Sequence, residues 1–304
     1  MPRVLSLLLA VALLAGCGGS SKAESDGLAH LDFGYPDASS AYVDHGRVNH
    51  DYPIAVHDVS FRSGAGTVRG FLLLPPQGPP RPAVVFVHGS GGDRTQLLTP
   101  AAWLAARGFV TMTLTAPSTS DPLPQPTSLT AFLRQQRQLV VRDVVAVRRA
   151  VDVLQGLKSV DGDRIGYVGW SSGAKLGTYL GASDDRFKAL ALLSAGADPL
   201  ASFVAHAPAA AKAQVRSELG AVDPLRYIAW AKADELLLED GRKDEVVPAA
   251  ALKNMIRAAP EGTTVRWYPA RHELGAKAYL DAFDWLADRL GADGRPIPGA
   301  RTGP

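Results

Sequence analysis

The chain has 304 residues, 46% of them hydrophobic and 20% charged, which is enough apolar material for a sizeable core and excludes a disordered or fibrous protein. Lys and Arg number 32 against 30 Asp and Glu, with no dense basic run, which argues against nucleic acid as the main partner. The single cysteine excludes an intrachain disulfide framework and a zinc site built from several cysteines.

The N-terminal segment has the pattern of a targeting sequence. Residues 4–14 are almost wholly apolar, but a bilayer span needs about 20 such residues. The run ends in LAGC at residues 14–17, which resembles the bacterial lipobox, where cleavage makes the cysteine the new N-terminus and a diacylglycerol is attached to it. We therefore expect a lipoprotein signal peptide at residues 1–16, lipidation of Cys17 and a flexible tether at 18–26. The domain would then be exported and anchored to the bacterial cell membrane. The alternative is a buried cysteine beside an ordinary cleavage site.

The stretch before the first predicted strand is polar. Residues 27–53 contain His30, His45 and His50, but no pair has the i, i+4 spacing of a helical metal site and none has a cysteine partner. We expect residues 17–53 to form the tether and an irregular wrap around the domain rather than a metal site. Residues 54–61 and 67–74 flank a short glycine turn and predict two strands in a hairpin.

The chain from residue 83 alternates between strands and helices. Strands are predicted at residues 83–87, 109–114, 164–168, 187–193, 235–239 and 263–268, and helices at 96–107, 128–154, 172–180, 249–258 and 274–290. Residues 116–126 predict a loop, 161–163 a turn, 198–230 an alanine-rich helical insertion and 291–304 a flexible tail. This alternation predicts an α/β domain over residues 54–290, with a mostly parallel, doubly wound sheet and an N-terminal antiparallel hairpin.

A G-x-S-x-G motif stands where a predicted strand gives way to a predicted helix. Its sequence is GWSSG at residues 169–173. A serine at such a sharp turn takes strained backbone angles, and small flanking residues let the two backbones approach. The hydroxyl of Ser171 would stand above the sheet beside a helix N-terminus, whose N–H groups face a developing oxyanion. We expect Ser171 to be a nucleophile. The alternative is a Gly/Ser turn that merely joins the two elements.

A glycine-rich loop, HGSGG at residues 88–92, directly follows the predicted strand 83–87. Such a loop offers free backbone N–H groups at the edge where open α/β sheets bind ligands. One of them, together with the N–H group of Ser172, could hold an oxyanion. A phosphate-binding loop is disfavoured because the P-loop lysine is absent, and a plain tight turn is the other alternative. We expect His88 to be structural.

A serine nucleophile needs a histidine base held by a carboxylate, and after a turn of this type the acid precedes the histidine in the chain. Only His206 and His272 follow Ser171. His206 lies in the alanine-rich insertion, whereas His272 follows a predicted strand and precedes the last helix. A loop at that place lies at the active edge of the sheet, so we expect His272 to be the base, with a helix-capping histidine as the alternative.

The acid is expected after the predicted strand 235–239. Asp244 lies beyond a glycine turn and faces the edge, whereas Asp240 is still at the end of the strand and Glu245 is a nearby alternative. Any of the three could simply cap a helix. We favour Asp244, because the loop beyond Gly241 can turn its side chain toward the next loop.

These motifs together resemble the α/β-hydrolase superfamily, and in particular its dienelactone-hydrolase-like esterases. The resemblance rests on the HGSGG loop, the GWSSG turn, GRKDEVVP at residues 241–248 and HEL at 272–274, and it covers about residues 54–290. It implies Ser171 as nucleophile, Asp244 as acid and His272 as base, with an oxyanion hole formed by the backbone N–H groups of Ser90 and Ser172. Dienelactone hydrolase itself has a cysteine at the nucleophile position, so its substrate does not carry over. Residues 198–230 exceed the family minimum and are expected to form a small helical cap.

The function expected from the sequence is hydrolysis of a small-molecule carboxylic ester through an acyl-enzyme, with no cofactor or metal. An acyltransferase or a peptidase could use the same three residues. A surface lipoprotein that keeps the fold as a binding module is the non-enzymatic alternative.

Overall fold

One nine-stranded sheet organises the part of the chain that the computed structural model describes, residues 30–36, 39–48, 52, 54–64, 66–76, 78–292 and 296–304. The strand order is β1-β2-β3-β5-β4-β6-β7-β8-β9. The pairs β1–β2, β2–β3 and β3–β5 are antiparallel, and all the others are parallel. The mostly parallel sheet with an N-terminal antiparallel hairpin is thus confirmed. The strands are β1 Val43–Arg47, β2 Ala55–Ser63, β3 Gly66–Leu74, β4 Arg81–Val87, β5 Val110–Leu114, β6 Val160–Trp170, β7 Phe187–Leu193, β8 Leu236–Gly241 and β9 Thr264–Tyr268.

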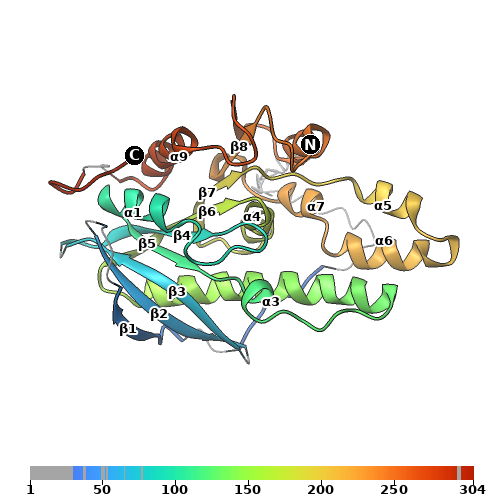
Figure 1. Ribbon diagram of the computed structural model, residues 1–304, viewed down its shortest axis with the longest axis horizontal. Helices are drawn as coiled ribbons and strands as arrows, with labels where there is room; N and C mark the ends of the chain where they lie inside the picture. The colour runs from blue at the N-terminus through green and yellow to red at the C-terminus, as the bar shows by residue number, and fades with distance from the viewer. Residues whose placement is uncertain are drawn as a thin grey trace, which may run out of the picture.

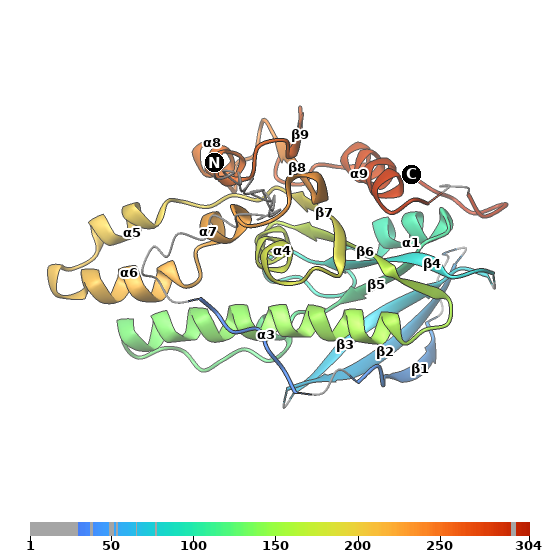
Figure 2. The same ribbon diagram turned by 180° about the vertical axis from the view of Figure 1, so that it is seen from behind.

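Helices cover both faces of this sheet (Figures 1 and 2). Helices α1 and α9 share a buried cluster with one face, and α3, α4, α7 and α8 share another with the opposite face, which is the doubly wound arrangement expected from the sequence. The helices are α1 Leu98–Ala106, α2 Pro117–Ser120, α3 Leu129–Gln155, α4 Ser172–Ser183, α5 Leu200–His206, α6 Lys212–Gly220, α7 Pro224–Ile228, α8 Ala249–Ala258 and α9 Ala276–Arg289, with 3-10 turns η1 Ala209–Ala211 and η2 Ala233–Glu235.

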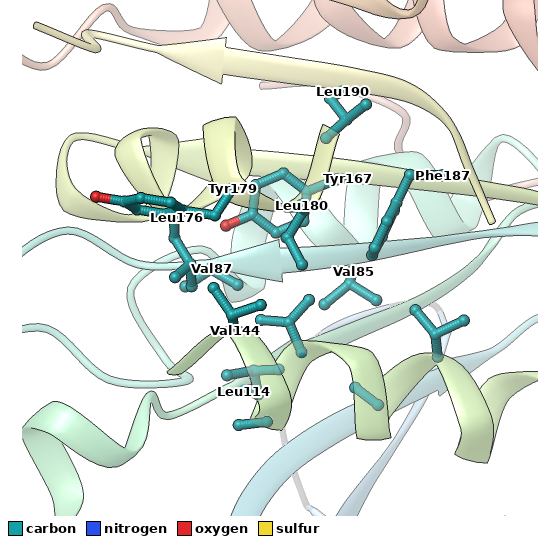
Figure 3. Close-up of a cluster of buried hydrophobic side chains, with 14 of the residues drawn as sticks. Val85, Val87, Leu114, Val144, Tyr167, Leu176, Tyr179, Leu180, Phe187 and Leu190 are labelled. Atoms are coloured by element: carbon teal, nitrogen blue, oxygen red, sulfur yellow. The ribbon is translucent and has the colours of Figure 1, made fainter. Parts of the chain in front are cut away.

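The central strands are apolar along their length because side chains on both faces are buried. All but one residue of β7 is buried, which is typical of a parallel strand covered on both sides. Figure 3 shows Val85 and Tyr167 of the sheet packed toward Val144 of α3. The rings of Tyr167 and Phe187 meet edge to face with centroids 6.0 Å apart. This close-packed interior fixes the strands, and hence the loops that leave their carboxyl ends.

Three elements differ from the sequence-based expectation. Val43–Arg47 forms β1 within the stretch expected to be irregular. All five of its residues are exposed, so backbone pairing to β2 at the edge of the sheet holds this strand, and burial of apolar side chains does not. The expected loop after β5 contains one helical turn, α2, with a proline at its first position. The expected turn at 161–163 lies inside β6. This strand begins before the turn residues, because Val160 pairs with Arg81 of β4.

Residues 198–230 are helical, as expected. Helices α5 and α6 lie beside the N-terminal half of α3 and extend with it beyond the sheet (Figures 1 and 2). A small cluster of Leu133, Val204 and Val215 holds this lobe together. Helix α7 packs against α4, the helix that follows the GWSSG motif.

The described N-terminal residues are bound to the domain. Leu31 and Phe33 are buried, the Leu31 N–H group donates to Tyr227 Oη at 3.0 Å, and Arg148 Nη1 donates to the Phe33 carbonyl at 2.7 Å. In the C-terminal tail, the Ile297 N–H group donates to Ala106 O at 2.7 Å. The expected signal peptide at 1–16, Cys17 and the tether at 18–26 lie outside the described residues. Among the helices that the structure does describe, none combines the length and apolarity needed to cross a bilayer.

Candidate active site

Ser171 lies on a strained turn between β6 and α4. Its φ and ψ angles are 56° and −112°, outside the conformations common to L residues. A Cβ atom on Gly169 would lie 2.4 Å from Gly173 O, and one on Gly173 would lie 2.3 Å from Val87 O, so both positions require glycine. The Ser171 N–H group donates to Leu193 O at 2.8 Å, which ties the turn to the end of β7. The GWSSG sequence therefore folds as the sharp strand-to-helix turn that its pattern predicts.

His272 connects Ser171 to Asp244 through two hydrogen bonds. Its Nε2 lies 3.0 Å from Ser171 Oγ, and its Nδ1 lies 2.8 Å from Asp244 Oδ2. The side chains of His272 and Asp244 are 12% and 1% exposed, so little water competes for these bonds. The structure thus brings together the three side chains that the sequence singles out as nucleophile, base and acid.

Asp244 is held in place by its own loop. Asp244 Oδ1 accepts the N–H groups of Val246 and Val247, both at 2.8 Å, which leaves Oδ2 for the imidazole. The loops that carry Asp244 and His272 also run side by side, and Lys243 N–H donates to Ala270 O at 2.9 Å between them. The carboxylate therefore has a defined orientation before any substrate binds.

Two backbone N–H groups lie on segments that adjoin Ser171: a Cβ atom on Gly89, the residue before Ser90, would come within 3.3 Å of Ser171 Cβ, and Ser172 follows Ser171 in the chain. Ser172 is the first residue of α4, and Ser90 lies in the loop after β4. Neither N–H group donates to an acceptor in the described part of the chain. The N–H group of Gly89, by contrast, donates to Gln96 Oε1 at 2.9 Å. The positive end of the α4 dipole adds to the attraction of negative charge at this place.

The other acids of this region have different environments. Asp240 stays in β8, where it is buried, and burial together with the nearby Asp244 charge raises its pKa to about 8. One oxygen of Asp240 has no hydrogen-bond partner among the described residues. Burial also raises the pKa of Glu239 to about 7, although Tyr268 Oη donates to it at 2.8 Å. Glu245 is exposed and pairs with Arg271 at 2.7 Å. Only Asp244 of these acids is hydrogen-bonded to His272.

The other histidines that the structure describes have other partners. His88 is buried, with Nδ1 2.7 Å from Gly89 O and Nε2 accepting the Ala116 N–H group at 3.0 Å, so it joins the loops after β4 and β5. His206 is exposed on α5, with Nδ1 2.7 Å from Ser202 O. His30 stacks on Trp230, His45 bonds to Ser60, and His50 lies outside the described residues. The described residues contain no group of three His, Cys, Asp or Glu placed to hold a metal ion.

Two residues at this site were not anticipated from the sequence. Trp170 Nε1 and Ser194 Oγ both donate to the carbonyl oxygen of His272, at 3.1 Å and 2.8 Å. Trp170 is part of the G-x-S-x-G motif, but the pattern leaves its identity open. Ser194 follows β7 in a run of small residues that carries no recognisable signal.

This arrangement can perform nucleophilic acyl transfer. A neutral imidazole that donates Nδ1–H to Asp244 has an unprotonated Nε2, which can accept the Ser171 hydroxyl proton. The two free N–H groups can stabilise negative charge on an oxygen beside Ser171. Groups with the chemistry of a nucleophile, a base, an orienting acid and two anion donors thus lie together at one edge of the sheet.

Comparisons with known proteins identify the family and the fold. A family model described as the alpha/beta hydrolase family matches residues 84–300. Among solved structures, an acetyl xylan esterase from Thermoanaerobacterium sp. superposes with a TM-score of 0.65 at 15% identity, over 81% of this chain and 87% of that one. An acetyl xylan esterase from Paenibacillus sp. gives 0.65 at 18% identity, over 82% and 88% of the two chains. A cold-adapted esterase from an Arctic intertidal metagenomic library gives 0.60 at 19% identity, over 82% and 99%. No curated protein matches in a sequence search.

Proposed function

Because the chain belongs to the alpha/beta hydrolase family, we propose that it is a serine hydrolase that cleaves carboxylic esters through an acyl-enzyme. The observation that carries this proposal is the chain of hydrogen bonds from Ser171 Oγ through His272 to Asp244 Oδ2, of 3.0 and 2.8 Å, at a strained turn. Structural neighbours described as esterases support the choice of ester over other acyl compounds.

The first half of the proposed reaction acylates the enzyme. Ser171 Oγ attacks the ester carbonyl carbon while its proton passes to His272 Nε2. The carbonyl oxygen becomes an oxyanion, held by the N–H groups of Ser90 and Ser172. Asp244 stabilises the imidazolium that forms and keeps Nδ1 protonated. The tetrahedral intermediate then collapses, and His272 gives the proton to the departing alkoxide, which leaves as the alcohol.

The second half regenerates the serine. A water molecule gives a proton to His272 Nε2 as its oxygen attacks the acyl carbon, and a second oxyanion forms in the same place. Collapse breaks the bond to Ser171 Oγ, which recovers its proton from His272, and the carboxylic acid leaves. No group beyond these residues and water is required.

We further propose that residues 198–230 act as a cap that shapes the acyl pocket. The lobe of α5 and α6 stands beside α3, and α7 contacts the helix that begins at Ser172. A series of 4-nitrophenyl esters with acyl chains from acetyl upward measures the acyl preference. Acetyl esters come first, because two of the neighbours above are acetyl xylan esterases.

Labelling by a fluorophosphonate probe, with wild type and Ser171→Ala compared, tests the proposed function. The expected result is labelling and ester hydrolysis by wild type, and loss of both in Ser171→Ala with the fold retained. Loss of a triad nucleophile can lower kcat by up to about a millionfold. Hydrolysis by Ser171→Ala at more than a few per cent of the wild-type rate would contradict the proposal. Added alcohols distinguish hydrolysis from acyl transfer, because a transferase forms the new ester in preference to the acid.

For localisation, we propose that cleavage before Cys17 and lipidation of its thiol anchor the domain outside the cytoplasm. The described chain contacts the domain from His30 onward, and the expected tether at residues 18–26 would join it to the lipidated cysteine. Cys17→Ser should abolish incorporation of a fatty-acid analogue and release the domain from membranes. Equal incorporation in wild type and variant would refute lipidation at this residue.

A further inference from the structure

The carbonyl oxygen of His272 accepts two side-chain hydrogen bonds that the reaction above does not use, from Ser194 Oγ and Trp170 Nε1. We propose that Ser194 and Trp170 are positioning residues, which hold the base by its main chain so that Nε2 faces the nucleophile. This inference rests on the proposed function for its catalytic meaning, while its structural content can be measured separately.

The sheet topology explains why the base needs such support. Ser171 follows β6 and His272 follows β9, with β7 and β8 between them. Neighbouring strands lie about 4.8 Å apart, so the base loop must come back over about 14 Å of sheet edge. It crosses β8 closely, since a Cβ atom on Gly241 would lie 2.3 Å from Arg271 O. Ser194 stands at the end of β7 and Trp170 at the end of β6, on the path the loop must take.

The backbone of Ser194 points to a role for its hydroxyl. Only Ser171 and Ser194 among the described non-glycine residues have a positive φ, 56° and 55°. Glycine adopts this conformation readily, and an L side chain disfavours it. The side chain of Ser194 is fully buried, and its N–H group donates to Glu239 O at 2.7 Å. In this backbone conformation Ser194 Oγ faces the His272 carbonyl oxygen. The two serines with a positive φ thus contact the same histidine, Ser171 at the imidazole Nε2 and Ser194 at the main-chain carbonyl.

Trp170 joins the base to the anion-binding loop. Its indole ring lies 5.1 Å from the His272 ring, between centroids, at an angle of 44°. Toward the loop after β4, a Cβ atom on Gly89 would come within 2.8 Å of the indole. The residue after Gly89 is Ser90, the proposed oxyanion donor. The indole thus fixes the spacing between base and oxyanion hole.

The experiment compares Ser194→Ala, Ser194→Gly, Trp170→Phe and the double variant Trp170→Phe/Ser194→Gly. Both replacements of Ser194 delete the donor, but only glycine also relieves the strain, so any effect that they share belongs to the hydroxyl. Two matched controls delete similar groups elsewhere. Ser183→Ala removes a hydroxyl that donates to Tyr179 O at 2.6 Å on α4, and Trp285→Phe removes a buried indole N–H without a partner in the described residues.

The expected kinetic result with 4-nitrophenyl acetate is a fall in kcat of about tenfold for each single variant, with KM within about twofold of wild type. The double variant should lose more than the product of the single losses, because the carbonyl then has no donor. A displacement of about 1 Å can cost about a hundredfold in rate. The controls should keep wild-type kcat. The inference is overturned if Ser194→Gly and Trp170→Phe keep kcat within about twofold, or if the controls lose as much.

A second readout does not depend on turnover. The proton between His272 Nδ1 and Asp244 Oδ2 should give a low-field NMR resonance, which His272→Ala assigns by its loss. The double variant should broaden or abolish this resonance, and the controls should retain it. An unchanged resonance in the double variant overturns the inference whatever the kinetics. A wild type with the resonance and its response to these variants, but without esterase activity, supports the positioning role and refutes the proposed function.

Discussion

Replacing Asp244 by Asn tests the acid, and the structure specifies how the new amide would sit. Asp244 Oδ1 accepts two N–H groups, from Val246 and Val247, so the Asn oxygen should take this place and its NH2 group the place of Oδ2, 2.8 Å from His272 Nδ1. Turning the amide over would set NH2 against two N–H donors and lose two hydrogen bonds, at about 1 kcal/mol or more each. The amide therefore donates toward Nδ1, which must become an acceptor.

The consequence is the wrong tautomer of the base. With Nδ1 unprotonated, the proton of a neutral imidazole lies on Nε2, which then donates to Ser171 Oγ instead of accepting its proton. The corresponding change of Asp to Asn in the triad of a serine protease costs about ten-thousandfold in kcat, or about 5.5 kcal/mol at 1.36 kcal/mol per tenfold. We expect a loss of similar size here, with the fold unchanged because both loop hydrogen bonds survive.

Asp240→Asn is the matched control for this prediction. The pKa of Asp240 is raised to about 8, so near neutral pH its carboxyl is mostly protonated and an amide replaces it without a change in charge. The assay is kcat/KM for 4-nitrophenyl acetate, with circular dichroism to confirm that each variant is folded. Asp240→Asn should stay within about tenfold of wild type. The reasoning fails if Asp244→Asn keeps more than about a tenth of the activity, or if Asp240→Asn is the more damaged of the two.

Three other predictions concern the base, the nucleophile turn and the buried acid. His272→Ala should lower kcat by up to about a millionfold, as loss of the nucleophile does, whereas His206→Ala should leave it unchanged; ester hydrolysis by both variants decides this. Gly173→Ala should destabilise the fold by about 1–3 kcal/mol, because the new Cβ would lie 2.3 Å from a carbonyl oxygen of β4. The control Gly162→Ala, whose Cβ meets nothing closer than 3.4 Å, should melt near wild type in thermal unfolding. In the folded chain Asp240 keeps its proton up to about pH 8, whereas in the unfolded chain it releases the proton near pH 4. Because the folded state binds more protons between these pH values, the free energy of unfolding should fall with rising pH, by up to about 1.4 kcal/mol per pH unit. Asp240→Asn should reduce this slope in urea titrations at about pH 5 and pH 8, and an equal slope in both proteins would show that Asp240 does not cause it.

The elements that the sequence predicts best are those defined by their own apolar pattern. The bounds of β7 and α8 are the predicted 187–193 and 249–258, because a continuous apolar run and an amphipathic stretch define them. The first strand has no such pattern. Val43–Arg47 lacks the alternation of apolar and polar residues that identifies a strand in a sequence. Main-chain hydrogen bonds to β2 hold it, so the strand is recognised only from its pairing in the structure. The sequence DGD at residues 161–163 has the composition of a turn, yet pairing beside β4 extends β6 through it.

The candidate site divides in the same way. Ser171, Asp244 and His272 could be proposed from sequence because each follows a recognisable strand, and parallel strands bring their carboxyl ends to one edge of the sheet. The strand order shows which residues are neighbours at this edge, and the sequence does not. Since β6, β7, β8 and β9 are neighbours, their ends contribute in turn Ser171, Ser194, Asp244 and His272.

The contacts of Ser194 could not be predicted in this way, because its partner is a main-chain oxygen 78 residues away. Every residue has a carbonyl group, so the identity of residue 272 gives no sign of what binds its oxygen. The hydrogen bonds to the imidazole ring require a histidine side chain at residue 272, and a sequence motif can identify such a side chain. The hydrogen bonds to the His272 carbonyl need only that the base loop crosses the end of β7. The residues of the proposed triad can thus be identified from the sequence, whereas the residues that we propose to position the base can be identified only once the order of the strands is known.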